Sequence, residues 1–174
     1  MQDILNLNKE FANYLEKSTA QMISDLNDIL FDKSVTYRLN YSKASIVTYY
    51  FEYEWDILDI AFWAVNKSGE VINEILILPT KKDSKIDATG KWNSFLPEKI
   101  AKFIYDFENN YEGADIDEVL EKYEEEKHIL FENWFCNCWT QTIKETDIKV
   151  NAYFSIHDTN YKTNLNNLER RPHL

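Results

Sequence analysis

Glycine is scarce in this sequence, and its scarcity excludes the nucleotide-binding loops that depend on it. The 174 residues contain three glycines, Gly69, Gly90 and Gly113, and no two of them are close together. Loops that hold phosphate groups need closely spaced glycines, so that backbone amides can approach the ligand. We therefore expect no P-loop, no Rossmann-type site and no cofactor. A serine nucleophile elbow is also excluded, because no serine has glycines two residues to either side.

Cysteine and long apolar runs are scarce as well. The two cysteines, Cys136 and Cys138, are too few for the disulfide framework of a small secreted protein, so we expect free thiols in a reducing compartment. No apolar stretch approaches the roughly 18 residues that cross a bilayer. Asp3, Lys9 and Glu10 interrupt the start of the chain where a signal peptide needs an apolar run. These absences predict a cytoplasmic protein that does not enter a membrane.

Basic residues are the third shortage. The chain has 19 Lys and Arg against 30 Asp and Glu, which gives a formal net charge of −11. At neutral pH such a surface repels phosphate backbones and anionic lipid headgroups, so direct binding of nucleic acid or membrane is disfavoured. The same charge attracts a basic protein surface. Plain solubility is the alternative explanation of an acidic balance.

Apolar side chains are plentiful and their spacing predicts three helical regions. Hydrophobic residues make up 44% of the chain and aromatic residues 15%, enough for a core. Residues 4–31 have apolar positions at the three-and-four spacing of an amphipathic helix. A second helix is predicted over 97–113, and a third from Asp115 or Asp117 onward. We expect the third to be kinked or split near Lys127, because a straight helix would be longer than the domain is wide.

Period-two alternation predicts the strands. Four of them are expected to form a meander whose last two strands make an antiparallel hairpin, over residues 35–41, 47–55, 57–65 and 71–78. A long exposed loop follows over 79–96, and a C-terminal strand over 148–157. We expect one domain over 1–158 and a loosely held polar tail over 159–174. This order predicts the α+β class, with an N-terminal helix and two later helices packed on an antiparallel sheet.

One set of residues has the spacing of metal ligands on a helix. His128, Glu132 and Cys136 recur every four residues, so neighbouring members could share an ion. The alternative is a surface histidine beside a glutamate, followed by a cysteine that faces the core. The sequence has no HExxH signature, so we expect no metal and keep His128 and Glu132 as the weaker alternative.

Four carboxylates gather in one short segment: Glu52, Glu54, Asp56 and Asp59. In a cleft, repulsion between like charges would separate their pKa values and prepare one of them as the acid of a hydrolase. Facing solvent, they would be ordinary polar residues that deter edge pairing. The second interpretation is favoured, because the segment has no His, Lys or Ser to act with them. We therefore expect no enzyme.

The most distinctive charge feature is an acidic run over residues 106–126. It contains ten acids and a single base, Lys122. Helical i,i+4 pairs cannot compensate so many like charges, so the run loses helix stability that a basic partner would restore. A solvated helix face, with acids favoured near the N-terminus by the helix dipole, is the alternative. The acids expected to bind a partner are Glu112, Asp115, Asp117, Glu118, Glu121 and Glu125.

Tryptophan supplies the expected anchors of that interface. The segment 129–139 is apolar around nearly the whole helical circumference, as in a central core helix. Trp134 and Trp139 are five residues apart and point in different directions, so one of them is expected to stay partly exposed beside the acidic run. Trp92, in a loop with several lysines, is the other candidate.

In size, acidity, α+β pattern and its tryptophan-rich helix, here FENWFCNCW from Phe131 to Trp139, the chain resembles the immunity proteins of bacterial polymorphic toxin systems. The resemblance implies an inhibitor that binds a cognate toxin and blocks its active site or a nearby surface. A phage inhibitor that imitates nucleic acid would have the same composition. A scaffold whose aromatic residues pack against copies of itself is a third interpretation, and the oligomeric state stays open.

Overall fold

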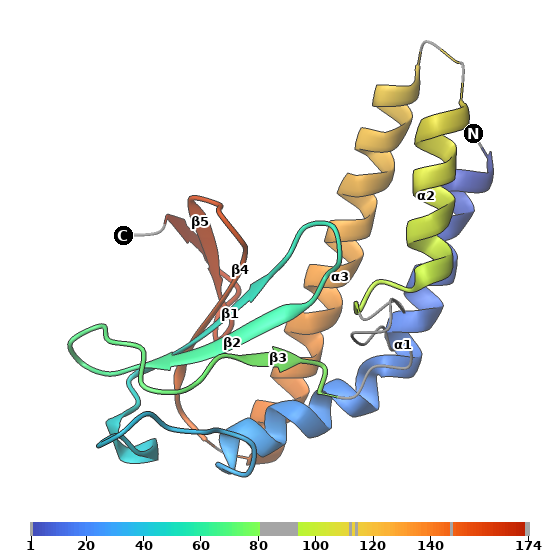
Figure 1. Ribbon diagram of the computed structural model, residues 1–174. Coiled ribbons are helices and arrows are strands. Elements are labelled where there is room, and N and C mark those ends of the chain that lie inside the picture. Colours follow the sequence, from blue (N-terminus) through green and yellow to red (C-terminus); the bar gives the residue numbers. More distant parts are fainter. Residues whose placement is uncertain (1, 81–93, 112, 114, 147, 173–174) are drawn as a thin grey trace.

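Three α-helices and a six-stranded sheet make up the described part of the chain, which gives an α+β fold in which α2 lies beside α1 and α3 and not on the sheet as expected (Figure 1). The computed structural model describes residues 2–80, 94–111, 113, 115–146 and 148–172. The helices are α1 (Gln2–Leu30), α2 (Glu98–Asn110) and α3 (Ile116–Thr146), with a short 3-10 turn, η1 (Lys43–Ser45). The strands are β1 (Thr48–Tyr53), β2 (Ile60–Val65), β3 (Leu76–Leu78), β4 (Asn151–Ile156), β5 (Tyr161–Asn164) and β6 (Arg170–Pro172).

The sheet has the order β3-β2-β1-β4-β5-β6 and is mostly antiparallel. Its central pair departs from the expected pattern, because β1 and β4 run parallel, with Phe51 opposite Phe154. Parallel neighbours need a long crossover between them. Here the chain leaves the sheet after β3, forms α2 and α3, and returns beside β1 in the same direction. The predicted hairpin is confirmed, since β2 and β3 pair antiparallel.

The prediction of a strand over residues 35–41 is wrong. One isolated bridge, from Tyr37 to Asn73, is formed there instead of a ladder. Val35, Tyr37 and Tyr41 pack partly against the core, but Leu39 is 87% exposed, so the alternating face is not buried along its whole length. Asn40 adopts a left-handed conformation, with φ at 72°, and turns the chain toward η1. The expected four-stranded meander is therefore a three-stranded one, β1 to β3.

The polar segment after residue 159, expected to be a loose tail, instead forms β5 and β6. This hairpin extends the sheet beyond β4. Its strands hold their place mainly through backbone pairing, which polar side chains do not prevent. Leu165, in the turn that connects the two strands, is a buried apolar residue. It donates its backbone N–H to the carbonyl oxygen of Ala152 on β4 at 2.9 Å.

The third helix is continuous over 31 residues, contrary to the predicted kink near Lys127. At 1.5 Å per residue it is about 45 Å long. Its C-terminal half packs on the sheet, where the rings of Phe135 and Trp139 lie 5.3 and 5.6 Å from that of Phe51. Its N-terminal half projects past the sheet beside α1 and α2 (Figure 1). The acidic run is thus held away from the sheet without any break in the helix.

The two faces of the sheet differ. The face against α3 is apolar and buried, with Phe51, Phe62 and Phe154 fully enclosed. On the other face the partly exposed rings of Tyr50 and Trp63 stack across β1 and β2 at 5.7 Å. In the described residues, no helix combines the length and the apolar character that a bilayer crossing demands.

Candidate functional site

The first half of α3 presents a row of exposed carboxylates, which we call the acidic stripe: Asp117, Glu118, Glu121 and Glu125. They recur at three- and four-residue spacings and therefore share one side of the helix. No Lys, Arg or His of the described chain lies within 4.0 Å of them. The stripe is a concentrated negative surface that the described part of the protein leaves unmatched.

Three other acids of the run, Asp115, Glu124 and Glu126, are half-buried and bind neighbours inside the protein. The Asp115 carboxylate accepts a hydrogen bond from the Tyr111 hydroxyl at 2.9 Å. The Glu126 carboxylate accepts one at 3.1 Å from the side-chain amide of Asn8 on α1. The expected partner residue Asp115 is therefore half-buried at the start of α3 and holds the α2–α3 connection. Glu112 lies outside the described residues.

The structure separates the three tryptophans expected to anchor a partner. Trp139 is 1% exposed and packs in the core, so its expected role as a contact residue is wrong for this fold. Trp134 is half-buried, and its indole N–H donates to the hydroxyl of Thr19 on α1 at 3.0 Å. Trp92 lies outside the described residues. Of the two diverging tryptophans, Trp134 stays partly exposed, as the sequence predicts for one of them, and Trp139 is covered.

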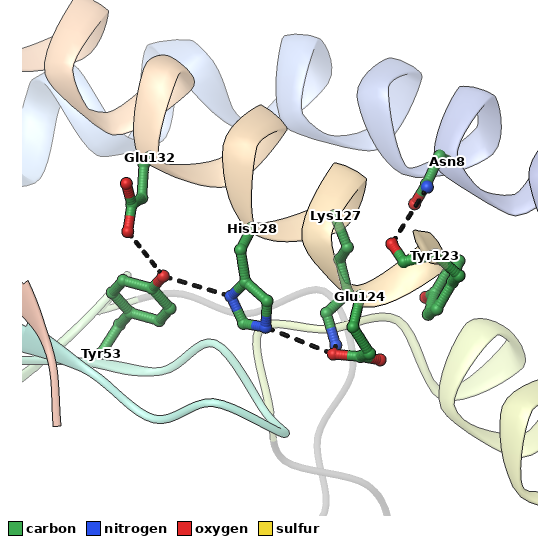
Figure 2. A network of polar contacts seen from close by, with 7 residues as sticks. All are labelled: Asn8, Tyr53, Tyr123, Glu124, Lys127, His128 and Glu132. Atoms are coloured by element: carbon green, nitrogen blue, oxygen red, sulfur yellow. Dashed lines mark hydrogen bonds and ion pairs between the residues drawn. The ribbon is translucent and has the colours of Figure 1, made fainter. Parts of the chain in front are cut away.

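A buried polar network joins α3 to the end of β1 (Figure 2). The Tyr53 hydroxyl lies 2.9 Å from Oε1 of Glu132 and 3.1 Å from Nδ1 of His128. On the other side of the histidine ring, Nε2 lies 3.2 Å from Oε2 of Glu124. The same carboxylate oxygen is 2.5 Å from the Lys127 ammonium. The network thus alternates acids and bases along one side of α3.

The Tyr53 hydroxyl connects Glu132 to the histidine. Burial raises the pKa of Tyr53 far above its ordinary range, and Glu132 raises it further, so the phenol keeps its hydrogen. That hydrogen is donated to Glu132. Nδ1 of His128 faces the phenol oxygen and Nε2 faces the Glu124 carboxylate, so the imidazole ring links Tyr53 to Glu124.

Glu124 contacts two buried basic side chains, Lys127 and His128. Burial alone would raise the pKa of its carboxyl, but His128 and Lys127 outweigh that effect and hold the pKa below its ordinary value. Lys127 is 2% exposed. A buried ammonium without a partner would cost several kcal/mol, so Glu124 is what allows Lys127 to stay charged there.

The predicted alternative of a metal at His128 and Glu132 gains no support from this geometry. The Tyr53 hydroxyl lies between the two side chains and hydrogen bonds to both. In the described ranges, no group of three or more His, Cys, Asp or Glu side chains is placed to hold a metal ion. Each polar group of the network binds a neighbour inside the fold, and the contacts of Tyr53 hold α3 against β1.

The four carboxylates of residues 52–59 do not converge. Glu52 is half-buried on the open face of the sheet, whereas Glu54 and Asp56 are exposed in the turn after β1. The Asp59 carboxylate accepts the backbone N–H of Phe95 at 2.7 Å and so ties this turn to the segment before α2. Acid–base chemistry that needs two of these groups side by side is not assembled here.

The two cysteines are free thiols held in apolar surroundings. Burial raises the pKa of Cys136 to about 11, and the Glu132 carboxylate adds to the rise. Burial raises the pKa of Cys138 to about 12. Both thiols therefore stay protonated at neutral pH, and neither has the thiolate character of a nucleophile or metal ligand.

Trp55 is an exposed aromatic residue that the sequence analysis overlooked. It lies in the turn after β1, is 45% exposed, and its ring lies 3.7 Å, centre to centre, from that of His128. The signal available in the sequence was an aromatic residue flanked by Glu54 and Asp56 at the end of a strand.

In comparisons with family models, curated proteins and solved structures, none matches the chain significantly.

Proposed function

We propose that this chain is a non-catalytic binding protein whose acidic stripe neutralises a basic protein partner. The observation that carries the proposal is the exposure of Asp117, Glu118, Glu121 and Glu125 with no described cation within 4.0 Å. An opposite charge brought by a partner gives such a surface the complementarity that speeds association and selects the partner.

The spacing of the stripe supports a role in binding. Glu121 lies three residues after Glu118, four after Asp117 and four before Glu125, which makes three like-charge neighbour pairs. Each such pair destabilises a helix by a few tenths of a kcal/mol, so the three cost about 1 kcal/mol together. A basic partner removes that repulsion. The position of the stripe on the projecting half of α3 leaves room for a partner to approach (Figure 1).

The class of inhibitor that we favour is a toxin immunity protein acting in the cytoplasm. Support comes from the resemblance in size, acidity and tryptophan-rich helix. A toxin that acts on nucleic acid has a basic active site, which would be a natural target for a row of carboxylates. A phage-type inhibitor that imitates nucleic acid uses the same chemistry and remains the alternative.

The test is affinity capture from lysates of the source cells with three forms of the full chain. The first is the wild type. The second carries Glu118→Lys, Glu121→Lys and Glu125→Lys in the stripe. The third is a control of identical net charge, with Glu16→Lys, Glu74→Lys and Glu145→Lys at three exposed positions elsewhere.

We expect the wild type and the control to retain the same basic protein, and the stripe variant to lose it. Elution of that protein at ~1 M salt, where the Debye length is only about 3 Å, would show that charge holds the complex. Equal loss from the stripe variant and the control would mean that net charge alone acts, and would refute the proposal.

A further inference from the structure

A cavity of about 290 Å³ lies where α2, α3 and the turn after β1 meet. It is smaller than the roughly 300–1,000 Å³ of sites for cofactors and drug-sized ligands, so it suits a single side chain. Its α2 wall includes Ala101, Ile104, Tyr105 and Glu108, which recur at helical spacing along one face of that helix. The cavity adjoins the half of α3 that carries the acidic stripe.

Two exposed aromatic side chains line this cavity. Trp55 is 45% exposed and Tyr105 is 66% exposed. The contact between Trp55 and the ring of His128 fixes the indole in place. Large aromatic surfaces left in water beside a cavity are expensive unless they serve binding, and their faces attract cations.

Three carboxylates line the same cavity: Asp56 from the turn, Glu108 from α2 and Glu124 from α3. Asp56 and Glu108 are exposed, and no cationic side chain of the described residues lies within 4.0 Å of either. Lys127 also lines the cavity, but its charge is already opposed by Glu124 at 2.5 Å. The carboxylates that remain to meet a ligand are therefore Asp56 and Glu108.

A third aromatic residue forms the inner wall. Tyr123 lines the cavity and is fully buried. Its hydroxyl is closed off from solvent, so it does not count among the groups that meet a ligand. The cavity thus offers aromatic surfaces and two unpaired carboxylates.

We propose that this cavity receives an arginine side chain of the basic partner, an inference that rests on the proposed function. Arginine fits the observed set better than lysine does. Its planar guanidinium stacks on aromatic rings and presents five N–H donors, so it can bind both Asp56 and Glu108. Lysine offers a compact point charge that is more strongly hydrated and gains less from the rings.

The frame of the cavity is preorganised. The turn after β1 is tied to the segment before α2 twice, because Leu96 N–H donates to the Ile57 carbonyl oxygen at 2.9 Å and Phe95 N–H donates to Asp59 at 2.7 Å. Rigid walls reduce the ordering entropy that binding would otherwise cost.

The experiment measures binding of fluorescein-labelled octa-arginine and octa-lysine to the full chain by fluorescence anisotropy. The cavity variant carries Asp56→Asn and Glu108→Gln. Its control carries Glu74→Gln and Glu145→Gln, which remove the same charge from exposed sites away from the cavity. A third variant, Trp55→Leu, removes an aromatic wall and leaves the charge unchanged. Circular dichroism and melting curves verify that each variant is folded.

We expect the wild type to bind octa-arginine more tightly than octa-lysine. The cavity variant should lose about tenfold or more in affinity for octa-arginine relative to the control, and Trp55→Leu should reduce the preference for arginine. Equal losses in the cavity variant and the control would overturn the arginine cavity, and so would equal affinity of the wild type for the two peptides.

The triple stripe variant, measured beside these, separates the two proposals. If it loses octa-arginine relative to its own charge-matched control while the cavity variant does not differ from its control, the cavity is wrong and the acidic stripe stands. If neither variant differs from its control, both proposals fall.

Discussion

Lys127 places a charge in the interior beside α2, and a neighbouring carboxylate opposes that charge. Its ammonium has Glu124 at 2.5 Å, while Glu124 also has His128 at 3.2 Å. Removal of Glu124 and removal of Lys127 therefore have different consequences. Lys127 loses its opposing charge if Glu124 is removed, whereas Glu124 keeps His128 if Lys127 is removed.

This difference predicts unequal costs for two single substitutions. Glu124→Gln leaves the ammonium of Lys127 buried without an opposite charge and should lower the free energy of unfolding by about 3 kcal/mol or more. Lys127→Met keeps the volume and leaves Glu124 with His128 as a hydrogen-bond partner, so it should cost clearly less. Urea unfolding of both variants provides the comparison. A larger loss from Lys127→Met would show that Glu124 is not the group that supports the lysine.

The same carboxylate gives the fold a dependence on acid. The pKa of Glu124 is lowered in the folded chain from an ordinary value of 4.5. The unfolded chain therefore takes up a proton first as the pH falls, so Glu124 contributes stability above about pH 4.5 that is lost as pH falls through the folded-state pKa. We expect the wild type to lose more stability than Glu124→Gln between about pH 5 and pH 3. Parallel acid-unfolding curves for the two proteins would contradict this.

At the scale of elements, the hairpin of β5 and β6 is the part that the sequence analysis missed. A run of polar residues predicts a tail when burial is judged from composition, but strands at a sheet edge are held by backbone pairing. Leu165 is the apolar residue in this polar segment that indicates the hairpin. It is 2% exposed, whereas Leu168, three residues later, is 58% exposed.

These two leucines make a matched test of whether the hairpin belongs to the fold. Leu165→Ala should lower the free energy of unfolding by about 2–3 kcal/mol, because a buried leucine loses both its burial and its packing. Leu168→Ala should stay within about 0.5 kcal/mol of the wild type. Urea unfolding is the measurement. Equal and small effects would mean that residues after 159 form the loose tail that the sequence predicts.

Other elements followed from the sequence to different degrees. The three helices were predictable because their apolar spacing is regular over many turns, and β1, β2 and β4 because alternation there accompanies burial. The segment 35–41 has the same alternation but forms only an isolated bridge, from Tyr37 to Asn73, and its failure to form a ladder is not visible in any local pattern. The parallel pairing of β1 with β4 depends on the path of α2 and α3, and so on contacts between distant residues.

The candidate site was predictable in its charge and not in its shape. The acidic run predicted the stripe on α3, because the acids outnumber the bases so strongly in one segment. Which acids face water was decided by tertiary contacts, such as the hydrogen bond from Asn8 to Glu126. The cavity beside Trp55 joins three elements that are far apart in sequence, and local spacing cannot show that they meet.

At the scale of the whole molecule, charge is divided between two ends. The acidic stripe lies on the projecting half of α3, and the hairpin of β5 and β6 carries Lys162, Arg170 and Arg171 at the far edge of the sheet (Figure 1). Under the proposed function, such a division of charge would orient the basic partner toward the helical end. The open face of the sheet carries the stacked rings of Tyr50 and Trp63, with Lys162 over the Tyr50 ring.

The continuity of α3 has a mechanical consequence. One unbroken backbone runs from the carboxylates at its exposed start to the aromatic residues that pack under the sheet. An acidic tail without fixed structure would have to be ordered on contact, which weakens the complex it forms. Here the carboxylates lie on a continuous helix whose C-terminal half is fixed in the core. The proposed partner would therefore bind a surface that is already ordered.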